Sequence, residues 1–259
     1  MSGDYDRPKL RTGRVADLAA MALEEIGRRG TPDAAARSDE AVRRVLDATF
    51  ARDGFDAAAL EQSLTGLRLQ QNDIIDIVIP AAAQTLGQMW DEDEAGFLEV
   101  SLACARLQEL CRRCGHTWQC DPTVQDCTGA LVAVVEGEDH ILGAIVLADQ
   151  LRRRKISVHV VFQATAGSIR ERLRLGSYDC VFFSASTESS VARLCELLRA
   201  IRKDKALCPT VAVGGQVLNY DSARVLKSEV LADYLTNDVE EVLSAVERER
   251  QPMPIMVAQ

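Results

Sequence analysis

The side chains best suited to chemistry lie in one short string, Glu138-Asp139-His140-Ile141-Leu142-Gly143. A neutral imidazole binds a metal through one ring nitrogen while a carboxylate orients the other, and Glu138 can supply that carboxylate. Gly143 leaves the surface beside the histidine free of a side chain, so that a bulky group can lie there. The string therefore predicts a ligand site with His140 as a metal ligand.

Three apolar runs bring further polar residues to the same place. The run 129–136 predicts a buried parallel strand that ends just before the string. The runs 178–184 and 209–213 end in Ser184-Ala185-Ser186 and in Gly214-Gly215. Because the carboxyl ends of parallel strands meet at one edge of a sheet, where α/β proteins bind ligands, these residues are expected on one rim.

The elements that position these residues change pattern near residues 120–128. Before this point, apolar periodicity and short connections predict a helical bundle. Its helices are expected at 38–50, 56–67, 72–90 and 97–113. Pro80 should kink the third helix or mark its true start.

After this point, strands alternate with helices. Strands are expected at 129–136, 156–162, 178–184, 209–213 and 232–236, and helices at 140–154, 168–175, 188–203, 221–227 and 238–249. The alternation predicts an α/β domain with a flavodoxin-like (Rossmann-like), doubly wound five-stranded parallel sheet. The expected domains are an N-terminal extension at 1–37 with one helix over 15–28, the helical bundle at 38–120, the α/β domain at 128–249 and a flexible tail at 250–259.

Composition limits the class of function. The chain has 259 residues, of which 47% are apolar, and a formal net charge of −9. This charge argues against a protein that holds DNA by itself, because nucleic-acid binders need a basic face. Neither a membrane-spanning apolar run nor a hydrophobic signal core is evident, so the expected location is the cytoplasm, away from membranes.

The eight cysteines are expected to be reduced thiols. Cys111, Cys114, His116 and Cys120 have a spacing compatible with zinc. Cys104 falls with Cys111 and Cys114 on the apolar stripe of a helix, however, which indicates packing. Zinc binding, a redox thiol pair and helix packing remain the three alternatives for this cluster.

The spacing Glu138-x-His140-x-x-Gly143, followed by the serines and by the glycine pair, resembles the cobalamin-binding domain family. The resemblance implies that His140 replaces the cofactor's own base as lower cobalt ligand, and that the displaced nucleotide tail lies in a slot lined by the serines and glycines. Glu138 stands where aspartate is usual, and Ser186 where a larger residue is usual. A branched side chain at either glycine is expected to fill the slot and leave the fold intact. The cofactor-binding residues implied are Trp90, Glu138, Asp139, His140, Gly143, Ser184, Ser186, Ser190, Gly214 and Gly215.

The bundle carries a second set of motifs. The string Leu86-Gly87-Gln88-Met89-Trp90 resembles the end of a bundle helix in corrinoid-binding modules, where the tryptophan packs over the upper face of the corrin. Trp90-x-x-Asp93, Phe97-x-x-Val100-Ser101 and Arg106-Leu107-Gln108 resemble the AerR/PpaA family of cobalamin-binding antirepressors from purple photosynthetic bacteria, and related sensor domains that hold haem.

This second resemblance implies a cofactor and a partner. The cofactor would be hydroxo- or adenosylcobalamin, with haem as the alternative, and the partner a DNA-binding repressor of photosynthesis genes, contacted in response to light or redox state. A non-enzymatic sensor is expected, since the three histidines form no catalytic pair and His159 falls in mid-strand. A haem sensor of the same fold and a corrinoid carrier for a methyltransferase remain as alternatives.

Overall fold

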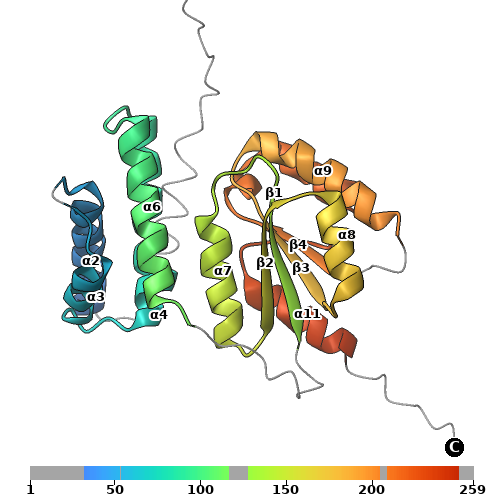
Figure 1. Cartoon of the computed structure of the whole chain (residues 1–259), viewed down its shortest axis with the longest axis horizontal. Helices are drawn as coiled ribbons and strands as arrows, with labels where there is room; N and C mark the ends of the chain where they lie inside the picture. The colour runs from blue at the N-terminus through green and yellow to red at the C-terminus, as the bar shows by residue number, and fades with distance from the viewer. Residues whose placement is uncertain (1–31, 53, 117–127, 205–208, 251–259) are drawn as a thin grey trace, which may run out of the picture. The chain divides into compact units, whose positions relative to one another are not determined.

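The computed structural model describes residues 32–52, 54–116, 128–204 and 209–250 (Figure 1). The chain forms two compact units, one ending at Cys114 and the other beginning at Gly115. The helix expected at 15–28, the tail after residue 250 and Cys120 lie outside the described residues.

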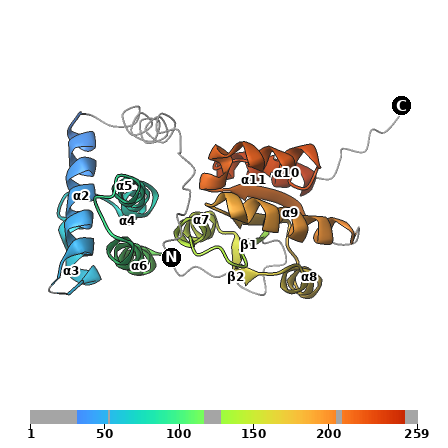
Figure 2. The same cartoon turned by 90° about the horizontal axis from the view of Figure 1, so that it is seen from above.

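The first unit is helical, as predicted. Its elements are α2 (Pro32–Phe50), α3 (Ala57–Thr65), α4 (Gln71–Asp73), the π-helix η1 (Ile74–Val78), α5 (Ile79–Asp91) and α6 (Phe97–Cys114). Helices α2, α5 and α6 pack on one another (Figure 2). Helix α2 begins at Pro32 rather than at Ser38, because a proline suits the first turn of a helix and the alanines that follow favour it.

The helix expected at 72–90 is present, because the chain is helical without a break from Gln71 to Asp91, but one of its turns is a π-helix. The π-helix η1 separates α4 from α5, and Pro80 lies in the first turn of α5. Proline has no N–H to donate, which costs nothing in a first turn but interrupts the bonding of a longer helix. Pro80 therefore does not mark the start of the helix, and the turn before it adopts π-type hydrogen bonding instead.

Arg106 joins two helices of the first unit. Its guanidinium Nη1 donates hydrogen bonds to the carbonyl oxygens of Thr49 (2.7 Å) and Ala51 (2.9 Å), at the end of α2. These bonds satisfy carbonyls that a helix end leaves without partners. The adjacent Leu107 is fully buried, so this part of the Arg-Leu-Gln motif serves the packing of the bundle.

The second unit is the five-stranded parallel sheet that the sequence predicts. Its strands are β1 (Gly129–Val135), β2 (Ser157–Ala164), β3 (Cys180–Ser184), β4 (Thr210–Gly214) and β5 (Tyr234–Leu235), in the order β2-β1-β3-β4-β5. Its helices are α7 (Leu142–Arg153), α8 (Ala166–Leu175), α9 (Glu188–Arg202), α10 (Arg224–Ser228) and α11 (Val239–Arg250). The helix expected at 221–227 consists of a 3₁₀ turn, η3 (Asp221–Ala223), followed by α10, and a further 3₁₀ turn, η2 (Gln216–Asn219), precedes it.

Alternate residues of the strands enter two apolar cores, one on each face of the sheet. Leu131 and Phe183 pack with α8, α9 and α10, whereas Val132 and Phe182 pack with α7 and α11. The neighbouring strands β1 and β3 therefore continue into helices on opposite faces, α7 and α9 (Figure 1). In a doubly wound sheet, such a switch point opens a crevice at the carboxyl ends of the two strands.

Candidate functional site

The loop after β1 presents a histidine at this switch point. His140 lies between the end of β1 and the start of α7, and its side chain is 62% exposed, whereas the side chain of Glu138 is fully buried. Glu138 Oε1 lies 2.5 Å from His140 Nδ1 and accepts a hydrogen bond from the His140 backbone N–H at 3.0 Å. The carboxylate thus engages Nδ1 in a hydrogen bond, which leaves Nε2 as the ring nitrogen that can bind a ligand.

The segment after β3 holds the other oxygen of the same carboxylate. Glu138 Oε2 accepts hydrogen bonds from the Ser190 hydroxyl at 2.7 Å and from the Ser186 backbone N–H at 2.9 Å. The Thr187 backbone N–H and hydroxyl add longer contacts at 3.2 and 3.3 Å. Glu138 therefore ties the loops of β1 and β3 together, and Ser190, which is fully buried, supports the carboxylate from behind.

Hydrogen bonding sets the protonation of this pair. Burial alone would raise the pKa of Glu138, but hydrogen bonds from His140, Ser186 and Ser190 outweigh burial and hold that pKa well below its usual range. The hydrogen bond to Glu138 raises the pKa of His140, against the lowering effect of burial, and the charge of Asp139 adds to the rise. Glu138 is therefore an ionised acceptor at neutral pH, which keeps the proton on Nδ1 of the neutral imidazole.

Gly143 and Ser184 lie beside this loop. Ser184 ends β3 and is 6% exposed. A Cβ atom at Gly143, in the first turn of α7, would lie 3.1 Å from the Ser184 hydroxyl oxygen. The absence of a side chain at Gly143 therefore makes space for the Ser184 hydroxyl.

Backbone atoms lie so close to Gly214 and Gly215 that neither position has room for a side chain. Gly215 has φ of 99°, and a Cβ there would lie 2.2 Å from the carbonyl oxygen of Ala185. A Cβ at Gly214 would lie 2.8 Å from the carbonyl oxygen of Thr236. The expectation that a branched residue leaves the fold intact is therefore wrong, since both positions require glycine whether or not a ligand is present.

Thr187 is a contact that the sequence reasoning missed. It is the residue just before α9, a position where Ser and Thr commonly cap a helix. Its hydroxyl is hydrogen-bonded to Ser190 (2.7 Å) and to Glu138, and not to a backbone N–H of the helix. A Thr at the start of a helix after a strand is the signal that could have drawn attention to it.

Comparisons with known proteins agree with this geometry. Residues 128–247 match the family described as B12 binding domain. The chain is also 32% identical over 171 residues to a Rhodobacter capsulatus protein, "Uncharacterized 20.5 kDa protein in bchF-crtJ intergenic region", across 64% of this chain and 86% of that protein. The chain belongs to the B12-binding domain family. The Methanosarcina barkeri monomethylamine corrinoid protein has the same fold, with a TM-score of 0.62 at 15% identity over 82% of this chain and 96% of that chain.

The residues of this B12-binding domain fit a corrin cofactor. An imidazole nitrogen can bind cobalt, and His140 offers Nε2 from an exposed ring whose other nitrogen is fixed by a buried carboxylate. The site stands at the switch point of the sheet, where sheets of this order bind their ligands. His140 would hold the cobalt, Glu138 holds His140, and Ser186 and Ser190 hold Glu138.

Trp90 lies in the other unit, at the end of α5. Its ring meets that of Phe97 edge to face, with centroids 6.0 Å apart. Phe97 and Leu98, which begin α6, are 72% and 77% exposed. The role of Trp90 over a corrin remains a prediction.

The cysteine cluster yields no metal site among the described residues, where no group of three or more His, Cys, Asp or Glu side chains is placed to hold an ion. Cys111 and Cys114 are buried on α6, and His116 donates its backbone N–H to Asp149 (2.7 Å). Burial raises the pKa of the Cys104 thiol, which disfavours the reactive thiolate. Zinc binding would need Cys120, which lies outside the described residues.

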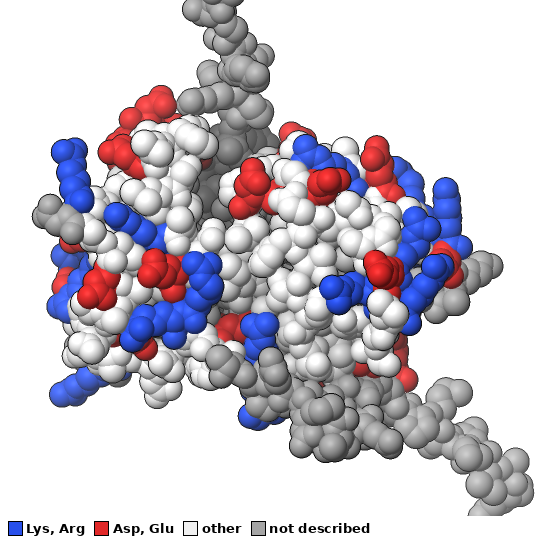
Figure 3. Space-filling model, in the orientation of Figure 1, with Lys and Arg blue, Asp and Glu red and all other residues white. Residues whose placement is uncertain are grey.

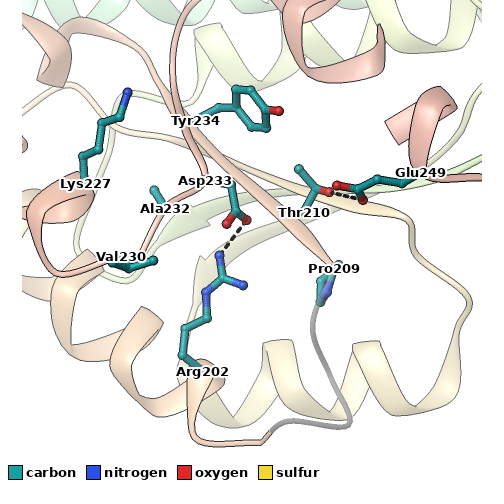
Figure 4. Close-up of a pocket in the computed structure, with 9 residues that line it drawn as sticks. All are labelled: Arg202, Pro209, Thr210, Lys227, Val230, Ala232, Asp233, Tyr234 and Glu249. Carbon is teal, nitrogen blue, oxygen red and sulfur yellow. Dashed lines mark hydrogen bonds and ion pairs between the residues drawn. The ribbon is translucent and has the colours of Figure 1, made fainter. Parts of the chain in front are cut away.

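A hollow of about 560 Å³ opens at the opposite edge of the sheet, where β4 and β5 begin (Figure 4). Two pairs of its polar side chains bond each other: Asp233 pairs with Arg202 at 2.6 Å, and the Thr210 hydroxyl donates to Glu249 at 3.3 Å. Because the strands run away from this edge toward His140, the hollow is separate from the cofactor site. Within the described ranges, no helix has the length and apolar character needed to cross a membrane.

Proposed function

We propose that this chain is a non-enzymatic, cobalamin-binding regulator that works in the cytoplasm as an antirepressor, through contact with a DNA-binding repressor protein. The observation that carries the proposal is the exposed His140 held by buried Glu138 at the switch point of a B12-binding domain. The motifs around Trp90 support the choice of regulator, because they resemble the AerR/PpaA family. The similarity to a protein named for the bchF-crtJ intergenic region supports it as well.

The protein's part in this function is to bind and to orient. Bound cobalamin would supply a cobalt centre that is sensitive to light or redox state. His140 Nε2 would hold the cobalt, and Glu138 keeps the imidazole in the required tautomer. A signal results only if the altered cofactor favours a different arrangement of the protein, since a ligand shifts an equilibrium by its unequal affinity for two states.

The charge of the chain favours a protein partner over direct DNA binding. The net charge is −9, and on the face shown in Figure 3 the Lys and Arg side chains are interspersed with Asp and Glu. Such a surface has no strongly basic face that could displace counterions from DNA, and this displacement supplies most non-specific affinity for DNA. In a gel-shift titration at physiological salt, we expect no tight binding of the pure protein to its own operon's promoter, and a changed shift when the repressor is present. Saturable sub-micromolar binding without the repressor would make the protein a direct transcription factor.

The cofactor itself is tested by spectroscopy. We expect purified protein to bind hydroxocobalamin, with a spectrum that differs between light and dark, and to show no haem Soret band. His140→Ala should abolish tight binding or leave the nucleotide base on cobalt. His159→Gln, which changes a histidine in the middle of β2, is the matched control and should bind as wild type does. An unchanged spectrum and affinity in His140→Ala would refute the assignment of the ligand.

A second candidate is a corrinoid carrier for a methyltransferase. It is favoured by the fold shared with the Methanosarcina barkeri monomethylamine corrinoid protein. Protein loaded with methylcobalamin would then lose its methyl group to thiol or folate acceptors when a partner enzyme is supplied. A regulator should retain the methyl group in the dark under the same conditions.

A further inference from the structure

The backbone just before Glu138 is held from two sides. The Gly137 N–H donates a hydrogen bond to Gln163 Oε1 at 2.9 Å, and the Gly137 carbonyl accepts one from Arg193 Nη1, also at 2.9 Å. Gln163 lies near the end of β2, and Arg193 lies on α9. The two side chains therefore reach the same glycine from a neighbouring strand and from a helix that covers the sheet.

Both the glycine and the glutamine have a left-handed backbone. Gly137 has φ of 74° and Gln163 has φ of 53°. A Cβ atom at Gly137 would lie 2.7 Å from Arg193 Nη1, so that only glycine lets the guanidinium approach the carbonyl without displacement. A left-handed conformation is uncommon for glutamine, and such residues persist where the surrounding structure holds them and cluster at functional sites.

The orientation of Gly137 matters because the next residue is Glu138. The Gly137 carbonyl belongs to the peptide that carries the Glu138 N–H, so the direction of the Glu138 side chain follows from it. That side chain must reach His140 with one oxygen and Ser190 with the other. A rotated peptide would turn the carboxylate away from at least one of them.

We propose that Gln163 and Arg193 are positioning residues for the lower cobalt ligand. By fixing Gly137 they fix Glu138, and through Glu138 they set the tautomer and the direction of His140. The part of this inference that concerns cobalt depends on the proposed function. The part that concerns the Glu138–His140 pair is a property of the protein without cofactor.

The test uses substitutions in the full chain. Arg193→Ala and Gln163→Ala each remove one of the two bonds to Gly137. Gln163→Glu keeps an acceptor oxygen at the same reach and should behave as wild type, which separates the hydrogen bond from the folding of the position. Arg199→Ala is the matched control, since Arg199 is an exposed arginine of the same helix whose partner is Glu229.

The first measurement is made without cofactor. Long-range ¹H–¹⁵N NMR of the His140 ring, assigned by its loss in His140→Ala, reports which nitrogen carries the proton. We expect the Nδ1–H tautomer in wild type, Gln163→Glu and Arg199→Ala, and a mixture of tautomers in Arg193→Ala and Gln163→Ala. A pure Nδ1–H tautomer in both alanine variants would overturn the proposal.

The second measurement uses the protein loaded with Co(II) cobalamin. The nitrogen splitting of the EPR spectrum changes with uniform ¹⁵N labelling of the protein only if a protein nitrogen binds cobalt. We expect the two alanine variants to show a several-fold smaller fraction of histidine-bound cobalt than Arg199→Ala shows. Equal fractions would count against the proposal. If wild type binds no cobalamin, the proposed function fails, while the ring NMR still decides whether Gln163 and Arg193 orient the histidine.

Discussion

Removal of the Ser190 hydroxyl is the most direct test of the support beneath the histidine. Ser190 is fully buried, and its hydroxyl donates to Glu138 Oε2 at 2.7 Å, a short bond to an ionised acceptor. Ser190→Ala deletes this donor without adding volume. Ser189→Ala is the matched control, because Ser189 is exposed in the same turn and contacts the Thr187 hydroxyl rather than the carboxylate.

The expected cost follows from the charge and burial of the acceptor. Hydrogen bonds to charged groups contribute about 1.5–3 kcal/mol, and a buried carboxylate that loses a donor keeps its desolvation penalty. The Ser186 and Thr187 N–H groups remain, so we expect Ser190→Ala to lower the free energy of unfolding by about 2 kcal/mol. The cost of Ser189→Ala should be below about 0.5 kcal/mol, as at most surface positions.

The measurement must report the second unit alone. Urea unfolding read by pulsed hydrogen exchange in peptides from β1 and β3 meets this need, because both strands lie in that unit. Since the folded pKa of Glu138 is depressed, the network stabilises the protein above the ordinary carboxyl pKa of about 4.5, and this stability is lost as the pH falls through the folded pKa. The two serine variants should therefore differ at pH 7 and converge in acid. Equal stability at pH 7 would refute the geometry around Glu138.

Two further predictions concern the ligand and the glycine pair. The pKa of His140 is raised, and a proton competes with cobalt for Nε2. The amount of cobalamin retained after desalting should therefore fall as the pH drops through that raised pKa, at a higher pH than for a free imidazole. His140→Ala should show no such step. Gly215→Ala should lower the free energy of unfolding of the cofactor-free protein by about 1–3 kcal/mol, because φ is 99° and the Ala185 carbonyl is 2.2 Å from the new Cβ. Gly87→Ala, in open space on α5, should raise stability by about 0.5–1 kcal/mol; an equal effect at both positions would mean that Gly215 is not needed by the backbone.

The sheet and the histidine could be predicted because their signals are local. Strands buried on both faces read as continuous apolar runs, as in 129–136, and each run was followed by a helical pattern. Glu138 and His140 are two residues apart, so their contact needs no knowledge of the rest of the fold. The alternation of strands and helices predicted a flavodoxin-like parallel sheet, and the observed strand order β2-β1-β3-β4-β5 agrees with that fold.

The missed features depend on contacts between distant segments. Gln163 and Arg193 meet Gly137 from 26 and 56 residues away, and no pattern near them indicates this. The clash that makes Gly215 obligatory comes from Ala185, on another strand's end. The π-helix before Pro80 was missed for another reason, since its apolar residues keep a spacing close to that of an α-helix.

The bond between Glu138 and Ser190 joins positions 52 residues apart in the sequence. Contacts of such separation form late, because the chain between them must close first. During synthesis, the histidine would gain its orientation only when the chain has left the ribosome as far as the first turn of α9 and the segments up to that turn have docked. These segments are β1, α7, β2, α8 and β3. Loading of the cofactor is thus tied to the completion of this half of the sheet, and a chain stalled before α9 should have no competent site to offer.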